Sequence, residues 1–369
     1  MIEKIKLLNF KCFNHAEIAM NRLTVLTGAN ASGKSTVIQS LILSDYTNRL
    51  GKHMGGRWDE VSIDVNSVFG FQIGAPNALV SQNPVDEGED YDFVISLCID
   101  GKEYGQGYEI DKTSPLALKV KAGVQMPECK MQYLNAERIG PRVSNQAGRG
   151  DGITFDGENA AYLIDVADRT ERSVSDILKA GLQSSNKFSY FVESWMSAIL
   201  GDMRLDIHTD YNKAITELRV KNGLVDNSVV PTLTGFGISY VLPIIVAGLW
   251  ASSDPDSILI LENPEAHLHP YAQSNMGKFL ALLAAGGVQV IVETHSEHII
   301  DGIRYQMAYV DKADQCTVNF MENEKSSIRI KAIQVSPKGE LSSWPKGFFD
   351  QKQNDLRDIF MLRKKDVKS

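Results

Sequence analysis

The sequence predicts an α/β fold in which a central sheet carries a phosphate-binding loop, with an antiparallel β lobe and a helical lobe attached. Three observations lead to this fold class. Residues 22–28 are an apolar, β-branched run, and residues 35–43 carry apolar side chains at helical spacing after a glycine-rich turn. The unbroken apolar run 258–261 is typical of a buried parallel strand. A similar run, 288–292, alternates with helical patterns between residues 230 and 305.

The turn after the first strand, GANASGKS over 28–35, matches G-x-x-x-x-G-K-[ST] at every fixed position. Gly28 and Gly33 permit backbone angles and close approaches that a side chain would block. Lys34 is expected to reach the β- and γ-phosphates, and Ser35 to place its hydroxyl on Mg²⁺. A chance match in a Gly/Ser-rich turn would not account for the flanking strand and helix. The predicted ATP-binding residues are Asn30, Ala31, Ser32, Gly33, Lys34, Ser35 and Thr36.

Both later strands end in a glutamate. Glu262 would lie at the carboxyl edge of the sheet, where ligands of open α/β sheets bind, and could hold a metal-bound water beside a triphosphate. The metal ligands predicted from the sequence are therefore Ser35 and Glu262. Glu293 is followed two residues later by His295, which could touch the γ-phosphate and the attacking water. A lone histidine is usually structural. His295, however, directly follows a predicted strand in a chain that also has the phosphate-binding loop and the strand ending in Glu262, and this favours a functional role.

The composition is that of a globular protein: 369 residues, 43% hydrophobic and 23% charged. A net charge of −8 argues against a surface that coats nucleic acid, although it permits a local basic patch. Four scattered cysteines without a C-x-x-C pair favour a reducing compartment over a zinc site. No signal peptide is evident, and the most apolar run, 238–250, is too short for a bilayer. We therefore expect a cytoplasmic protein with no membrane segment.

One nucleotide-binding domain is expected over residues 1–310. Residues 1–26 predict two strands, residues 51–135 form strands and turns of a β lobe, and residues 140–250 form a helical lobe. Residues 311–369 are expected to add a C-terminal extension of one or two strands and a final helix.

Three motifs together, GANASGKST, LENPEAHLHP and VETHS, resemble those of ABC-type ATPases of the SMC and OLD (overcoming lysogenization defect) lineage. Compact bacterial members of this lineage are usually labelled AAA-family ATPases. YLNAERIGPR (133–142), DGEN (156–159) and WPKGFFDQ (344–351) resemble one compact subgroup with an uncharacterised C-terminal region. The resemblance covers nearly the whole chain. It implies an ABC-type ATPase head, and active relatives hold two ATP molecules between two heads.

Such a sandwich needs a signature segment that reads the partner's γ-phosphate. The corresponding segment is 232–249, in which Gly235, Gly237 and Ser239 come just before and at the start of an apolar helix, a degenerate match to L-S-G-G-Q. The resemblance thus adds Gly237 and Ser239 to the ATP-binding residues. The alternative interpretation is an ordinary turn that enters a core helix.

One position departs from the family pattern, because Asn263 stands where a second acidic residue usually acts as general base. An amide cannot accept a proton from water as a carboxylate can. Either Glu265 or Glu293 takes that role, or hydrolysis is slow. Glu265 and His267 could instead serve helix-start chemistry around Pro264.

The junction between the lobes holds a metal-sensing Q-loop in ABC heads. Glu137 and Arg138 are candidates for this role and Gln72 is a rival, while a surface salt bridge explains Glu137 and Arg138 almost as well.

The resemblance supports three functional classes. The first is a regulatory ATPase that dimerises around ATP and controls a separately encoded effector, a nuclease or toxin, in anti-phage defence. The second is a DNA-end or repair clamp, which would need a basic groove across a dimer. The third is a transporter subunit, which ENPEAHLHP disfavours. We find no long coiled coil and no acidic cluster of the kind that would indicate an OLD nuclease domain.

Overall fold

A mixed sheet of six strands lies at the centre of the computed structural model, in the order β15-β14-β3-β13-β12-β8. Neighbouring strands are parallel except for β15, which runs antiparallel to β14. The bounds are β3 Leu23–Gly28, β8 Met131–Leu134, β12 Ile258–Glu262, β13 Gln289–Glu293, β14 Cys316–Glu324 and β15 Ser327–Gln334. The structure describes residues 1–85, 90–114, 116–148, 151–179, 185–222, 228–233, 235–254, 256–324 and 327–366.

Alternate side chains of the central strands enter two hydrophobic cores, because successive residues of a strand point to opposite faces. Ile258 and Ile260 pack in the core that includes α1 (Lys34–His53) and the β lobe. Leu259 and Leu261 pack in the other core, with α4 (Phe236–Ala251), α5 (Pro270–Ala285) and α6 (Glu297–Tyr309). The central strands are therefore covered on both faces, which explains the unbroken apolar run 258–261 of β12.

The β lobe is an antiparallel sheet in the order β2-β1-β5-β6-β7-β4. Its bounds are β1 Ile2–Phe10, β2 Phe13–Ala19, β4 Ser62–Asp64, β5 Phe93–Ile99, β6 Lys102–Ile110 and β7 Ala117–Gly123. The sheet thus recruits two strands that precede the predicted range 51–135. In contrast, β8, at the end of that range, pairs with β12 in the central sheet.

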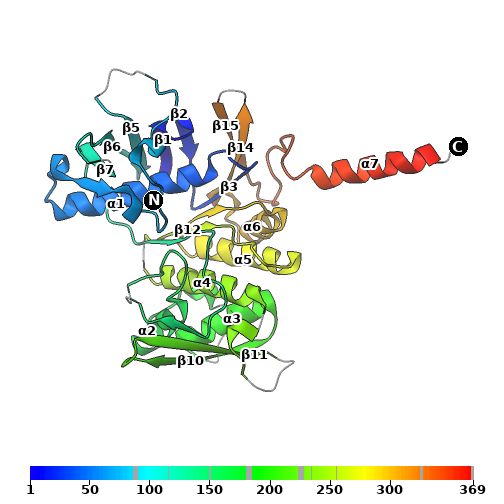
Figure 1. Cartoon of the computed structure of the whole chain (residues 1–369). Helices are drawn as coiled ribbons and strands as arrows, with labels where there is room; N and C mark the ends of the chain where they lie inside the picture. Colours follow the sequence, from blue (N-terminus) through cyan, green and yellow to red (C-terminus); the bar gives the residue numbers. More distant parts are fainter. Residues whose placement is uncertain are drawn as a thin grey trace.

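The helical lobe contains α2 (Ala160–Arg169), α3 (Phe188–Leu200) and α4, and it lies on the opposite side of the central sheet from the β lobe (Figure 1). It also contains a three-stranded antiparallel sheet, β10-β11-β9, which the sequence analysis did not predict. The bounds are β9 Ser144–Gln146, β10 Met203–Asp210 and β11 Ile215–Asn222. Short 3₁₀ helices span Trp58–Glu60, Val65–Ser67, Pro76–Leu79, Asp176–Leu178, Pro231–Leu233 and Ala313–Gln315.

The segment after residue 310 begins inside the central sheet, since β14 pairs with β3 from Cys316↔Leu23 to Met321↔Gly28. After β15 the chain returns to that sheet, where Phe348 is buried against Phe320 with ring centroids 5.3 Å apart. The last helix, α7 (Gln351–Asp366), extends away from the body of the molecule (Figure 1). Within the described residues, no helix is both long and apolar enough to cross a membrane.

Candidate functional site

The phosphate-binding loop connects β3 to α1, and its two glycines are held in conformations that other residues avoid. Gly28 has φ +142°, and a Cβ there would lie 2.1 Å from the carbonyl oxygen of Met321 on β14. Gly33 has φ +91°, and its Cβ would lie 2.6 Å from the Phe13 ring. Both positions therefore require glycine for space as well as for backbone angle.

The lysine of the loop lies against the loop itself. Lys34 Nζ donates to the carbonyl oxygens of Ala29 at 2.7 Å and Gly28 at 3.2 Å, and it lies 4.0 Å from Glu293 Oε1. Burial lowers the pKa of Lys34, while the nearby Glu293 carboxylate opposes that shift. The ammonium group is thus held where the loop ends, within reach of an anion that enters the loop.

Glu262 and Glu293 are register partners on the neighbouring parallel strands β12 and β13. The Ser35 hydroxyl donates to Glu293 Oε2 at 2.9 Å, and the Tyr133 hydroxyl donates to Glu262 Oε1 at 2.7 Å. The sequence analysis predicts Ser35 and Glu262 as joint metal ligands, whereas in the structure the Ser35 hydroxyl contacts Glu293. The reason is the strand order, because β13 lies between β3 and β12.

Both carboxyl groups have raised pKa values. Burial is the main cause for each, and the neighbouring Glu262 raises the pKa of Glu293 further, to about 7, against the opposing effects of Ser35 and Lys34. Burial also raises the pKa of Glu262, although the hydrogen bond from Tyr133 lowers it. Glu293 is therefore a group that can exchange a proton near neutral pH.

Glu265 holds the segment that follows β13. Its Oε2 accepts from the Thr294 hydroxyl and its Oε1 from the backbone N–H of His295, both at 2.7 Å. One oxygen of Glu265 thus holds Thr294 and the other holds the backbone of His295. The imidazole of His295 is exposed, and burial of part of the ring together with the charge of Lys34 lowers its pKa. The neutral ring can accept or donate a hydrogen bond at neutral pH.

The alternative interpretation, that Glu265 and His267 serve the start of a helix near Pro264, is wrong because no helix starts in that described part of the chain. The helix begins at Pro270, and the His269 side chain caps it by accepting from the backbone N–H of Tyr271. Asn263 adopts φ 45°, in the left-handed region that asparagine tolerates better than most residues. Its backbone N–H donates to the Glu293 carbonyl at 2.9 Å, which ties the turn after β12 to β13.

The predicted signature segment lies beside this turn. Gly235 caps the N-terminus of α4, and a Cβ on Gly237 would lie 3.5 Å from the carbonyl oxygen of His267. Ser239 is half-buried, whereas Leu233 is 74% and Phe236 53% exposed. Thr234, which also belongs to the predicted segment, lies outside the described residues.

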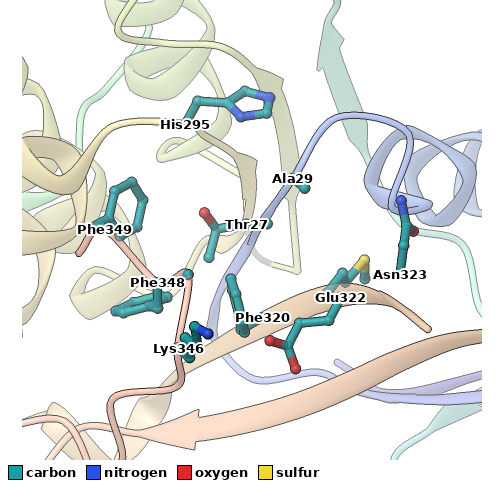
Figure 2. A pocket seen from close by; sticks show the side chains of 12 residues that line it. Thr27, Ala29, His295, Phe320, Glu322, Asn323, Lys346, Phe348 and Phe349 are labelled. Carbon is teal, nitrogen blue, oxygen red and sulfur yellow. The ribbon is translucent and has the colours of Figure 1, made fainter. Parts of the chain in front are cut away.

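A pocket of about 360 Å³ opens beside the phosphate-binding loop. Figure 2 shows Thr27 near the end of β3, His295 and the aromatic side chains of Phe348 and Phe349 around it. The sequence indicated residues 344–351 only as part of a family resemblance, so their position next to His295 is new information. The full lining is Thr27, Gly28, Ala29, His295, Phe320, Met321, Glu322, Asn323, Lys346, Gly347, Phe348 and Phe349.

The Q-loop candidates differ in their surroundings. Gln72 and Glu137 are exposed, whereas Arg138 is buried and donates to backbone carbonyls. The surface salt-bridge interpretation is therefore wrong for Arg138.

Comparison with known proteins identifies the family. The family model described as "AAA domain, putative AbiEii toxin, Type IV TA system" matches residues 23–301. The chain belongs to this family. A second family model, "Protein of unknown function (DUF3696)", matches residues 312–359 of the AAA ATPase. The structure confirms the predicted α/β fold, in which a central sheet carries the phosphate-binding loop and an antiparallel β lobe and a helical lobe are attached.

The AAA ATPase is similar to the OLD nuclease of Thermus scotoductus, with 22% identity over 364 residues. This similarity covers 89% of the chain but 65% of that relative's length. The AAA ATPase is also similar in structure to the SMC head domain from Thermotoga maritima, with 14% sequence identity and a TM-score of 0.44. The similarity covers 90% of this chain and 99% of that chain. A second solved structure is an Smc head with an extended coiled coil bound to a domain of ScpA, derived from Pyrococcus furiosus (12% identity, 97% and 99%, TM-score 0.49).

Proposed function

We propose that this AAA ATPase hydrolyses ATP with Mg²⁺, and that bound ATP draws two copies together head to head. The observation that carries this proposal is the position of the signature segment. The N-terminus of α4 packs beside the turn after β12 through Gly237, while Leu233 and Phe236 next to it are exposed. A second copy could supply the same segment to the open side of the nucleotide, and two-fold symmetry would then create two equivalent sites.

The residues around the loop fit a magnesium nucleotide. Ser35, Glu262 and Glu293 offer oxygen atoms, the ligand type that Mg²⁺ takes in proteins, and one or two carboxylates suffice beside phosphates. We propose that Ser35 and Glu262 hold Mg²⁺, which when bound neutralises charge on the phosphates. The Ser35 hydroxyl keeps free lone pairs while it donates to Glu293.

Hydrolysis needs a group that accepts a proton from water. Glu293 fits this role best, because its pKa is raised to about 7 and Asn263 cannot act as a base. Glu265 fits less well, since both of its oxygens already accept hydrogen bonds. His295 would contact the γ-phosphate. Glu293 also accepts the hydrogen bond from the Ser35 hydroxyl, so one of its oxygens is already occupied, which is consistent with slow hydrolysis.

The effector is proposed from the relatives. The family description names a toxin of a toxin–antitoxin system, and the curated relative is a nuclease. We therefore propose that the ATP-bound dimer controls a separately encoded nuclease or toxin in defence against phage. A cell that expresses the ATPase with its neighbouring gene is the system in which this role is testable.

Ser239→Arg tests the dimer. The substitution places bulk and charge at the proposed seam, so ATP should no longer associate the heads, while ATP binding to the loop of each monomer persists. Light scattering on the Glu262→Gln background, where hydrolysis is blocked, measures the association. Ser62→Arg is the matched control, because it makes the same change at an exposed position of the β lobe.

Three results decide the proposal. The Glu262→Gln protein and its Ser62→Arg form should associate with ATP, and its Ser239→Arg form should not. If the Glu262→Gln protein stays monomeric with ATP bound, or Ser239→Arg associates like its parent, the sandwich is wrong. Cells that carry Ser239→Arg and the partner gene should also lose protection against phage.

A further inference from the structure

A second pocket, of about 410 Å³, lies between α1, β8 and the loop 151–155, and its described lining includes no residue of the phosphate-binding loop. The wall from α1 consists of Ile42, Asp45, Tyr46 and Arg49, whose spacing of three or four residues places them on one face of the helix. On the other side, β8 is the last strand of the central sheet. A volume of this size is in the range of sites that bind small molecules.

Buried amide side chains hold the loop of this pocket in place. The backbone N–H of Ile153 donates to Gln132 Oε1 on β8 at 2.8 Å. Asn159 is 2% exposed, its Oδ1 accepts from the backbone N–H of Thr154 at 2.9 Å, and its Nδ2 donates to the carbonyl oxygen of Gly152 at 2.8 Å. The wall opposite α1 is therefore formed without a ligand, which lowers the cost of binding one.

Two buried polar side chains of the pocket can still bind a ligand. Gln132 is 7% exposed, and its Nε2 has no partner among the described residues although protein atoms do not enclose it. Asp45 is 8% exposed; its Oδ2 accepts from Arg49, and the described contact of its Oδ1 is the Cys129 thiol at 4.0 Å. Burial raises the pKa of the Asp45 carboxyl, and Arg49 opposes that shift. The pocket thus offers one N–H donor and one oxygen acceptor.

Aromatic side chains and one glycine shape the rest of the pocket. The rings of Tyr133 and Phe155 lie with their centroids 5.5 Å apart, and Tyr46 adds a third ring from α1. Such rings favour a flat ligand that can stack on them. A Cβ on Gly152 would lie 2.8 Å from Oε1 and 2.9 Å from Nε2 of Gln132. A side chain at position 152 would therefore push the amide aside.

We propose that this pocket binds the base of a free nucleoside or mononucleotide. A nucleobase is flat, and proteins read its hydrogen-bonding edge with polar groups while they stack its faces on aromatic or apolar side chains. Gln132 Nε2 would donate to a carbonyl oxygen or ring nitrogen of that edge, and Asp45 would accept from a neighbouring N–H. Arg49 is 60% exposed beside Asp45 and would remain within reach of a ribose or a phosphate. This site is separate from the proposed ATP site and does not depend on it.

Calorimetric titration of the Lys34→Ala protein tests the pocket without tight ATP binding at the phosphate-binding loop. Guanosine, adenosine, cytidine and uridine are titrated separately, and ribose alone is the reference. We expect at least one nucleoside to bind with a Kd of about 0.1 mM, the affinity that a ligand of this size typically reaches from its number of atoms. Ribose should not bind, because it lacks the flat base.

Variants of the two polar side chains locate the base. Gln132→Glu keeps an oxygen for the Ile153 N–H but replaces the available donor by an acceptor, and Asp45→Asn removes the charged acceptor. Each should weaken nucleoside binding about 10-fold or more, because a buried polar group then loses its partner. Asp202→Asn is the matched control, since it makes the same change at an exposed position of the helical lobe and should bind like Lys34→Ala alone.

A third variant acts through space alone. Gly152→Ala leaves every polar group present but displaces the Gln132 amide, so it should also weaken binding about 10-fold. Gly140→Ala is its control, because a Cβ there would make an ordinary contact with Phe236 at 3.5 Å. If Gln132→Glu or Asp45→Asn does not fold, as circular dichroism would show, the comparison of Gly152→Ala with Gly140→Ala decides the question.

Three results would overturn this assignment. The first is that none of the four nucleosides binds at about 1 mM, roughly ten times the expected Kd. The second is that a nucleoside binds equally well to the folded pocket variants and to Lys34→Ala alone, since the base would then lie elsewhere. The third is that a short single-stranded oligonucleotide binds while no nucleoside does. A failure of the heads to associate with ATP would leave the assignment intact and count against the dimer alone.

Discussion

Glu293→Gln should remove a pH-dependent loss of stability from the nucleotide-free, metal-free protein. Glu293 is 6% exposed, and its pKa is raised from 4.5 to about 7, chiefly by burial. Below pH 4.5 the acid is protonated in both the folded and the unfolded protein. Between the two pKa values the folded state keeps a proton that the unfolded state has lost. Stability from this group is therefore greatest at low pH and declines until the pH passes about 7.

The size of the effect follows from the shift. The pKa of Glu293 differs by about 2.5 units between the folded and the unfolded protein. This difference corresponds to at most about 3 kcal/mol in the free energy of unfolding, since each pKa unit is worth about 1.36 kcal/mol. Glutamine does not titrate and keeps an oxygen for the Ser35 hydroxyl. The free energy of unfolding of Glu293→Gln should thus rise relative to the parent by about 2 kcal/mol from about pH 5.5 to about pH 8.

Urea unfolding in the presence of a chelator measures this difference at each pH. Glu340→Gln is the matched control, because it makes the same change at an exposed carboxylate. If the difference between Glu293→Gln and the parent stays flat over the range, the cost assigned to burying the charged carboxylate is refuted.

Three further predictions concern nucleotide chemistry. Lys34→Ala should abolish tight ATP binding because it removes the charge that neutralises the β- and γ-phosphates; unchanged affinity for a fluorescent ATP analogue in a folded variant would rule out the phosphate-loop role. Glu262→Gln should keep ATP bound while phosphate release falls about 10²-fold or more. Glu265→Gln should slow release less than Glu262→Gln, because an amide oxygen still positions either Thr294 or His295; equal losses would show that Glu265 acts in the chemistry itself.

The local sequence carries much of the fold and the site. A glycine-rich turn between an apolar strand and a helix marks the phosphate-binding loop, and apolar runs that end in Glu262 and Glu293 mark neighbouring parallel strands. Because such strands end at the same edge of a sheet, the two glutamates meet there. These inferences need only short stretches of chain.

Other features depend on pairings that a local pattern does not contain. The contact of Ser35 with Glu293 follows from the position of β13 beside β3, which no single segment reveals. Arg138 lies in a loop, where a charged side chain is usually exposed, so its burial depends on the arrival of α4 and the turn after β12. The β10–β11 hairpin lies between segments with helical patterns, so the composition of the range 140–250 as a whole indicates helices and not this hairpin.

The pairing of β14 with β3 sets the time at which the protein can begin to work. The ribosome makes Gly28 early, but the Met321 carbonyl that lies against it follows about 290 residues later. At typical rates of synthesis this interval is roughly 15 to 60 s. Until β14 emerges, the phosphate-binding loop lacks one of its walls, and an unfinished copy should not hold ATP tightly.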